Sequence, residues 1–168
     1  MTLYKAETAV IAATDGTIAA AGADRLTVVV SALAAASITK TAGDNQTATV
    51  NTSVATAPQV RVDDLYGNPV SGASVTFAVA TGGGSGTVLT GTTNASGLVS
   101  VGSWTLGTGA GSNTMTATTG ALAAVTFVAT GRAGAPSAAT STLSTNISSV
   151  VINGTVTVTV TLKDRKST

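Results

Sequence analysis

Apolar and hydroxyl-bearing residues alternate strictly along residues 155–162, so that three valines and a leucine lie on one side and four threonines on the other. Successive side chains point to opposite faces of a β-strand, and this alternation therefore predicts a strand with one buried face. The same period of two recurs in residues 59–62, 74–79, 113–118 and 125–129. The short alanine runs never show the apolar spacing of a helix, so we predict an all-β chain built from antiparallel strands.

Turn-forming residues separate these segments. Gly, Asn, Asp, Ser and Pro cluster in residues 64–72, 81–86, 94–97 and 107–112. This spacing of roughly 10 to 15 residues is close to that of a sandwich or barrel. Charged residues make up only 9% of the chain, whereas Gly contributes 19 residues. Because Val, Ile and Thr suit a pleated surface and Gly suits tight turns, short strands joined by turns fit this composition.

Two internal similarities indicate a repeat. Residues 60–64 resemble residues 160–164, which lie 100 residues later. Separately, residues 11–18 resemble residues 115–122, and residues 26–28 then resemble residues 125–127. A period near 100 residues is the size of one immunoglobulin-like sandwich. We therefore expect tandem modules: the C-terminal strands of one module in residues 1–32, a complete module in residues 33–131, and the N-terminal strands of a following module in residues 132–168.

The complete module carries an ordered set of motifs. Residues 60–77 read Val-Arg-Val-Asp-Asp-Leu-Tyr-Gly-Asn-Pro-Val-Ser-Gly-Ala-Ser-Val-Thr-Phe, and they are followed by Thr-Asn-Ala-Ser-Gly at residues 93–97 and Trp-Thr-Leu-Gly at residues 104–107. This order resembles the bacterial immunoglobulin-like group 1 repeat of the invasin and intimin adhesins. The resemblance implies sandwich modules that are stacked end to end as spacers and that carry an adhesive tip away from the outer membrane.

The residues that we single out have structural roles. We expect a turn built from Gly67, Asn68 and Pro69, capped by the carboxylate of Asp64, because Asx side chains accept hydrogen bonds from turn amides. We place Gly72 at the end of the turn region of residues 64–72, and Gly97 in the second connection, residues 94–97. We place Trp104 at the centre of the core, after a bulge or bend near Gly102. The resemblance also predicts a Gly-Asn-Pro turn soon after Asp164, whereas the sequence there reads Arg-Lys-Ser-Thr.

The types of residue present in the chain argue against an active site. The chain has no His and no Cys, and only seven carboxylates, so we expect neither catalysis nor a cofactor. Adjacent Asp63 and Asp64 point to opposite faces of a strand, which does not suit a two-carboxylate glycosidase. One alternative stays open: Asp63, Asp64 and Asn68 could hold Ca²⁺, although the spacing of a calcium loop is absent and a plain capped turn explains them.

Partners and location follow from the same features. The basic residues are scattered, so we expect no nucleic-acid partner, and no apolar stretch reaches 18 residues, so this segment does not insert into a membrane.

We predict a structural module of a bacterial cell-surface or secreted adhesin-like protein, extracellular, with its export signal, anchor and receptor-binding region elsewhere. Its partners are neighbouring modules, and the two partial modules could pair head to tail between copies. The alternatives are a phage virion module that binds host surfaces weakly and a carbohydrate-binding module of a secreted enzyme.

Overall fold

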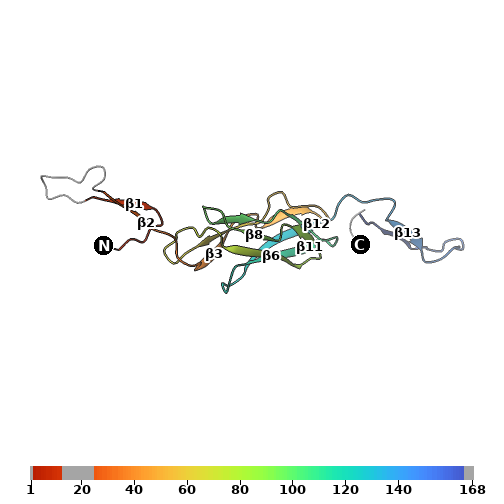
Figure 1. Cartoon of the computed structure of the whole chain (residues 1–168). Helices are drawn as coiled ribbons and strands as arrows, with labels where there is room; N and C mark the ends of the chain where they lie inside the picture. The colour runs from red at the N-terminus through yellow and green to blue at the C-terminus, as the bar shows by residue number, and fades with distance from the viewer. Residues whose placement is uncertain (1, 13–24, 165–168) are drawn as a thin grey trace.

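The computed structural model describes residues 2–12 and 25–164, and those residues form fourteen β-strands and no helix. Figure 1 shows three parts that follow one another along one long axis: the β1–β2 hairpin, a central pair of sheets, and the β13–β14 hairpin. The all-β prediction is confirmed. The parts follow one another in chain order, as modules do in a tandem array.

The larger sheet of the central part has five strands in the order β4-β12-β11-β6-β8. These strands are β4 (Gln46–Thr49), β6 (Ser74–Thr81), β8 (Thr90–Thr92), β11 (Gly111–Thr118) and β12 (Val125–Arg132). Strand β12 pairs antiparallel with β11 and parallel with β4. The strand at the end of this part therefore lies beside one from its beginning, which closes the central part into a single unit.

The second sheet has three antiparallel strands in the order β3-β5-β9. They are β3 (Ser37–Ala42), β5 (Gln59–Asp63) and β9 (Leu98–Ser100), and a separate short pair is formed by β7 (Ser85–Thr87) and β10 (Ser103–Thr105). The two sheets cover a common hydrophobic core. This arrangement is an immunoglobulin-like antiparallel β-sandwich, the predicted fold class.

The core consists of side chains that alternate along their strands. Buried residues alternate with at least partly exposed ones along β5 and β12, in the first half of β6 and from Asn113 onward in β11. The buried hydrophobic residues on these strands are Val60, Val62, Val75, Phe77, Met115, Ala117, Phe127 and Ala129. The period of two in the sequence therefore corresponds to strands that bury one face against the opposite sheet.

Trp104 is fully buried and belongs to this core cluster. The chain around it does not form one bulged strand. Strand β9 ends at Ser100 in the three-stranded sheet, and β10 begins at Ser103 in the separate pair with β7. Between them the N–H of Gly102 bonds the Thr87 carbonyl. The change in alternation before Trp104 thus marks a passage from one sheet to another.

The strand expected over residues 155–162 is shorter and differs in burial. Strand β14 spans Val158–Thr161 and pairs with β13 (Thr142–Thr145), and every residue of both strands is exposed. The expectation of one buried face is wrong for this hairpin as it stands. A strand buries a face only against a second layer, and within residues 2–12 and 25–164 no second sheet covers β13 and β14.

The β1–β2 hairpin resembles the β11–β12 pair at the end of the central sandwich. Strands β1 (Thr8–Ile11) and β2 (Leu26–Val29) are antiparallel, with Ile11 opposite Leu26. In the complete module Met115 lies opposite Phe127. The sequence match predicts that Ile11 takes the place of Met115. The strand pairing then puts Leu26 in the place of Phe127, whereas the sequence match aligns Leu26 with Val125, two residues earlier. Residues 13–18 of the first match lie outside the described residues.

Candidate functional site

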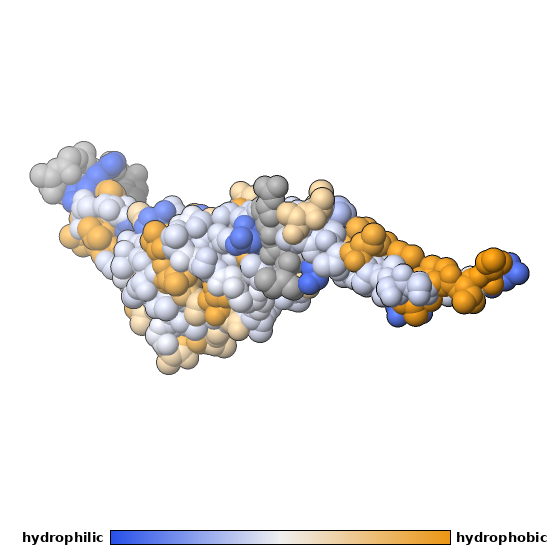
Figure 2. All heavy atoms as spheres, turned by 90° about the vertical axis from the view of Figure 1, so that its right-hand side faces the viewer, coloured by the Kyte–Doolittle hydropathy of each residue, from blue (hydrophilic) through white to orange (hydrophobic). Residues whose placement is uncertain are grey.

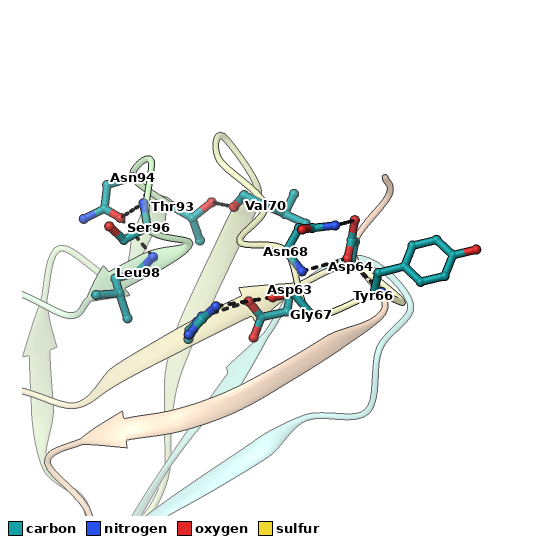
Figure 3. Close-up of polar contacts among 11 residues, drawn as sticks. Asp63, Asp64, Tyr66, Gly67, Asn68, Val70, Thr93, Asn94, Ser96 and Leu98 are labelled. Carbon is teal, nitrogen blue, oxygen red and sulfur yellow. Dashed lines mark hydrogen bonds and ion pairs between the residues drawn. The ribbon is translucent and has the colours of Figure 1, made fainter. Parts of the chain in front are cut away.

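The turn after β5 is held by the carboxylate of Asp64. Its Oδ1 accepts hydrogen bonds from the backbone N–H groups of Tyr66 at 2.8 Å and Asn68 at 2.9 Å. The Asp64 N–H donates to the Asn68 carbonyl, and the Gly67 N–H returns to the Asp64 carbonyl. Gly67 has a φ of 80°, a conformation that glycine adopts without strain. The sequence thus forms a closed turn whose donors converge on one carboxylate (Figure 3).

The second oxygen of Asp64 reaches outside the turn. Its Oδ2 accepts the Leu33 N–H and the Asn68 side-chain amide, both at 2.9 Å. Leu33 lies in the segment that joins β2 to β3. Burial alone would raise the pKa of Asp64, but the hydrogen bonds from the Asn68 side chain and from the N–H groups of Leu33, Asn68 and Tyr66 outweigh it and lower the pKa from 3.8 to about 2. The carboxylate therefore stays charged and joins the turn to the linker.

Asn68 bonds the sandwich to the segment that precedes β1. Its Oδ1 accepts the Ala6 N–H at 2.8 Å, and its Nδ2 donates to the Tyr4 carbonyl at 2.7 Å. With the additional bond to Asp64, both polar atoms of the amide are used, and the side chain is buried. We call this arrangement of Asp64 and Asn68 with Tyr4, Ala6 and Leu33 the joint, because it holds the β1–β2 hairpin against the sandwich.

Two tyrosines flank the joint. The ring of Tyr4 lies against the ring of Tyr66, with centroids 4.7 Å apart and planes inclined by 54°. Beside them is an open pocket of about 400 Å³, lined by residues 4–6 and 66–69. Figure 3 shows the Tyr66 ring projecting away from the turn. Neither tyrosine was singled out from the sequence, although Tyr66 lies within the Asp64 motif.

The second connection of the module packs against this turn. The backbone around Gly97 leaves so little room that an added Cβ would lie 2.6 Å from the Val62 carbonyl oxygen and 3.1 Å from the Pro69 side chain. Asn94 caps this connection by accepting the N–H groups of Ser96 and Leu98. The Asp64 turn is thus supported from behind by a second capped turn.

Gly72 and Thr93 link the two turns. The Gly72 N–H donates to the Thr93 carbonyl at 2.8 Å, and the Thr93 hydroxyl donates to the Val70 carbonyl at 2.6 Å. Of the residues singled out from the sequence, six therefore lie in or beside one pair of turns: Asp64, Gly67, Asn68, Pro69, Gly72 and Gly97. Trp104 lies apart from them, in the core.

A similar arrangement begins at the other end of the sandwich. The N–H of Gly134 donates to the buried carboxylate of Asp164, as the Leu33 N–H does to Asp64. The Ser137 N–H donates to the Lys163 carbonyl, as Ala36 does to Asp63. The repeat of about 100 residues is thus a repeat of linker contacts. The residues after Asp164, where the sequence departs from Gly-Asn-Pro, lie outside the described residues.

The contacts around Asp64 are those of a capped turn. Each of its oxygens accepts two N–H groups, so that its lone pairs point at hydrogen-bond donors. Asp63 forms an ion pair with Arg61, with its Oδ1 2.8 Å from Nε. Throughout the part of the chain that the structure describes, no three His, Cys, Asp or Glu side chains gather as metal ligands would. The described residues also contain no apolar helix of the length that a membrane span requires.

Comparison with known proteins identifies the fold. No protein-family model matches this sequence, and no curated protein does. Among solved structures, FdeC, a broadly conserved Escherichia coli adhesin, has 23% identity and a TM-score of 0.56, covering 90% of this chain and 48% of the FdeC chain. Invasin, a bacterial integrin-binding protein, has 24% identity and a TM-score of 0.48, covering 77% of this chain and 26% of its own. The D00–D0 domains of intimin have 17% identity and a TM-score of 0.47, with coverages of 64% and 55%.

This chain spans about half the length of the FdeC chain that it matches. At 23% identity the likeness to FdeC shows the fold, an immunoglobulin-like sandwich of the kind found in bacterial adhesins. The resemblance noted in the sequence is therefore confirmed at the level of the fold.

Proposed function

We propose that this chain is a non-catalytic spacer segment of a bacterial cell-surface or secreted adhesin-like protein. One observation carries the proposal: the side chain of Asn68 makes hydrogen bonds to two backbone groups of the preceding segment while Asp64 holds the linker. A turn that bonds its own module, the linker and the neighbour at once restricts how the two parts rotate. Joints that restrict rotation make an array of domains stiff, and a stiff array holds its two ends far apart.

The shape of the chain supports this role. The hairpin, the sandwich and the second hairpin lie in a row (Figure 1), and linker contacts of one type recur at both ends of the sandwich. In such an array each module adds length in the same direction. The functional partners of the segment are then the modules before and after it, and a receptor is bound by regions outside this segment. An extracellular location, with anchoring also supplied from outside, follows from the proposed role.

Spin-label distances test the rigidity of the joint. The chain has no cysteine, so V29C on the exposed face of β2 and T118C on the sandwich give one unique label pair. We expect a narrow distance distribution in the labelled protein. N68A removes both hydrogen bonds to residues 4 and 6 and also the bond to Asp64, so the distribution should broaden and the melting temperature should fall by a few degrees.

Asn94 supplies a matched control, since it caps a turn of the same module but bonds only residues of that module. N94A should leave the distance distribution narrow. A distribution of equal width with and without N68A would contradict the proposed role of the joint.

We also propose that isolated copies of this chain associate head to tail. Strands β13 and β14 leave apolar side chains exposed, with Val160 at 60% and Leu143 at 71%. Figure 2 shows apolar residues gathered along this arm. In the sandwich, β3 and β5 face the sheet that contains β11 and β12. The repeat makes β13–β14 the counterpart of β3–β5, and β1–β2 the counterpart of β11–β12, so the two hairpins present halves of one type of interface.

A further inference from the structure

The pocket at the joint has the dimensions of a small-ligand site. It encloses about 400 Å³ between residues 4–6 of the leading segment and residues 66–69 of the turn. Ligand sites in proteins commonly have volumes of roughly 300 to 1,000 Å³ and combine aromatic walls with a few polar groups. Because its two walls come from different modules, the pocket exists only while the joint is formed.

Its aromatic wall contains both tyrosines of the chain. Tyr4 is 54% exposed and Tyr66 is 51% exposed, whereas Phe77, Trp104 and Phe127 are buried in the core. The two rings are in contact and inclined by 54° to each other, and both keep about half of their surface open to solvent. Such rings offer a flat apolar surface and a hydroxyl that donates and accepts hydrogen bonds.

The charges beside the pocket are already paired. The ammonium of Lys5 lies against the carboxylate of Glu7, and Arg61 bonds Asp63. The carboxylate of Asp64 is used by four N–H groups. An ionic ligand would have to compete with these partners, whereas a neutral polyhydroxyl ligand needs only an apolar face and polar groups at the rim.

We propose that the joint pocket binds a neutral saccharide. One pyranose ring packs its apolar C–H face on the ring of Tyr66, next to Tyr4, and its hydroxyls bond the phenol hydroxyls and the Lys5 ammonium. The structure thereby supplies the exposed aromatic surface that the buried Phe77, Phe127 and Trp104 cannot.

A proline-rich peptide is the other ligand that aromatic grooves bind, but the ring spacing argues against it. A polyproline helix repeats every three residues, which corresponds to about 9 Å. The tyrosine centroids are 4.7 Å apart, so the rings touch and leave no slot between two successive ridges. A platform of two touching rings fits a single sugar ring better than it fits an extended helix.

Saccharide binding would stabilise the joint, because a ligand that binds only the formed pocket favours that state by mass action. The proposal thus rests on the joint that the spacer role uses. A single sugar ring of about a dozen heavy atoms gives a dissociation constant on the order of millimolar. Repetition along a stalk would raise the avidity of such weak sites.

Nuclear magnetic resonance titration of the ¹⁵N-labelled chain tests this proposal. The probes are four neutral disaccharides, namely maltose, lactose, cellobiose and N,N′-diacetylchitobiose, each taken to about 50 mM so that millimolar binding saturates. We expect at least one of them to shift the amide signals of Lys5, Tyr66 and Gly67, with a single dissociation constant of about 1 to 10 mM. Shifts elsewhere on the sandwich should be small.

Two variants test whether the sugar stacks on the ring of Tyr66 or only contacts an apolar side chain. Y66L keeps an apolar side chain without a ring and should weaken binding by about tenfold or more. Leu65, the preceding residue of the same turn, is 74% exposed and does not line the pocket, so L65A should bind as the parent does. The Ala6 amide signal reports in each variant whether the joint is still formed.

Three outcomes overturn the saccharide site: no saturable shift with any of the four disaccharides, equal affinity in Y66L, or saturation by a decaproline peptide instead. The label distances across the joint decide the spacer role separately, so a narrow distance distribution without saccharide binding removes only the site.

Discussion

At the scale of single residues, Asp64 has the most contacts to explain. Its carboxylate accepts four N–H groups from three residues in the turn and the linker, and these bonds hold its pKa at about 2 despite burial. The sequence predicted the turn-capping role from an Asx residue beside Gly-Asn-Pro. It did not show that one oxygen would reach the linker, because Leu33 contributes only a backbone N–H there, which no side-chain pattern marks.

The lowered pKa of Asp64 makes stability depend on pH. The folded pKa of about 2 lies below the ordinary value of 3.8, so the stabilisation is fully present above about pH 4 and is lost as the pH falls through 2. D64N removes this titration and should flatten the fall in melting temperature between pH 4 and pH 2, while lowering the melting temperature at pH 7. Melting curves of both proteins at closely spaced pH values measure the effect. An acid profile unchanged by D64N would contradict the assignment.

Trp104 allows a second test at this scale. Its side chain is fully buried, and within the described residues its Nε1–H has no hydrogen-bond partner. W104A should cost about 3 to 5 kcal/mol of unfolding free energy because it leaves a large cavity. W104F should cost clearly less, since Phe keeps an aromatic ring and removes a donor whose burial is itself unfavourable by about 1 to 3 kcal/mol. Urea unfolding measures both, and an unchanged midpoint in W104A would place the centre of the core elsewhere.

At the scale of elements, the two turns of the module act as one support. Gly67 and Gly97 both have a positive φ, 80° and 72°. A Cβ at Gly67 meets open space, but a Cβ at Gly97 would lie 2.6 Å from the Val62 carbonyl oxygen. The second turn therefore packs on the end of β5 directly behind the Asp64 turn.

This difference predicts unequal effects of the same substitution. G67A should cost about 1 kcal/mol, the strain of a left-handed conformation with a Cβ. G97A adds a backbone clash to that strain and should cost at least twice as much. Denaturant unfolding of the two variants gives the comparison, and equal losses would show that the close approach behind β5 can relax.

The hairpins show what strand pairing adds to sequence matching. The partners of β1 and β2 place Leu26 in the position of Phe127, two residues away from the position that sequence similarity assigns to it. Ladders fix which residues are opposite each other, whereas a similarity among Val, Thr and Leu tolerates a shift of two because it preserves the faces.

At the scale of the whole molecule, the exposed hairpins are where we propose that isolated copies of the chain associate. Because β13 and β14 have no second layer within the described residues, their apolar faces are open to a strand pair from another copy. Heterologous contacts of this kind extend into chains rather than closed dimers.

Sedimentation velocity across a range of concentrations tests the association. We expect the sedimentation coefficient to rise with concentration in the parent chain. V160K introduces a charge on the apolar side of β14 and should hold the chain monomeric, whereas T159K, on the opposite side of the same strand, should associate as the parent does. A monomer at every concentration would rule out head-to-tail pairing.

The sequence by itself determined the fold class and the residues of the turns. Alternation with period two follows from the geometry of a strand, and Gly, Asn, Pro and Asp follow from local backbone conformation, so residues 59–62 and the Asp64 turn were predictable. Only the tertiary structure decided which sheet each strand joins, why alternation changes before Trp104, and that Tyr4 meets Tyr66. These are contacts between segments distant in the chain. Their specificity comes from packing and from backbone donors such as the Leu33 N–H, which leave no local pattern in the sequence.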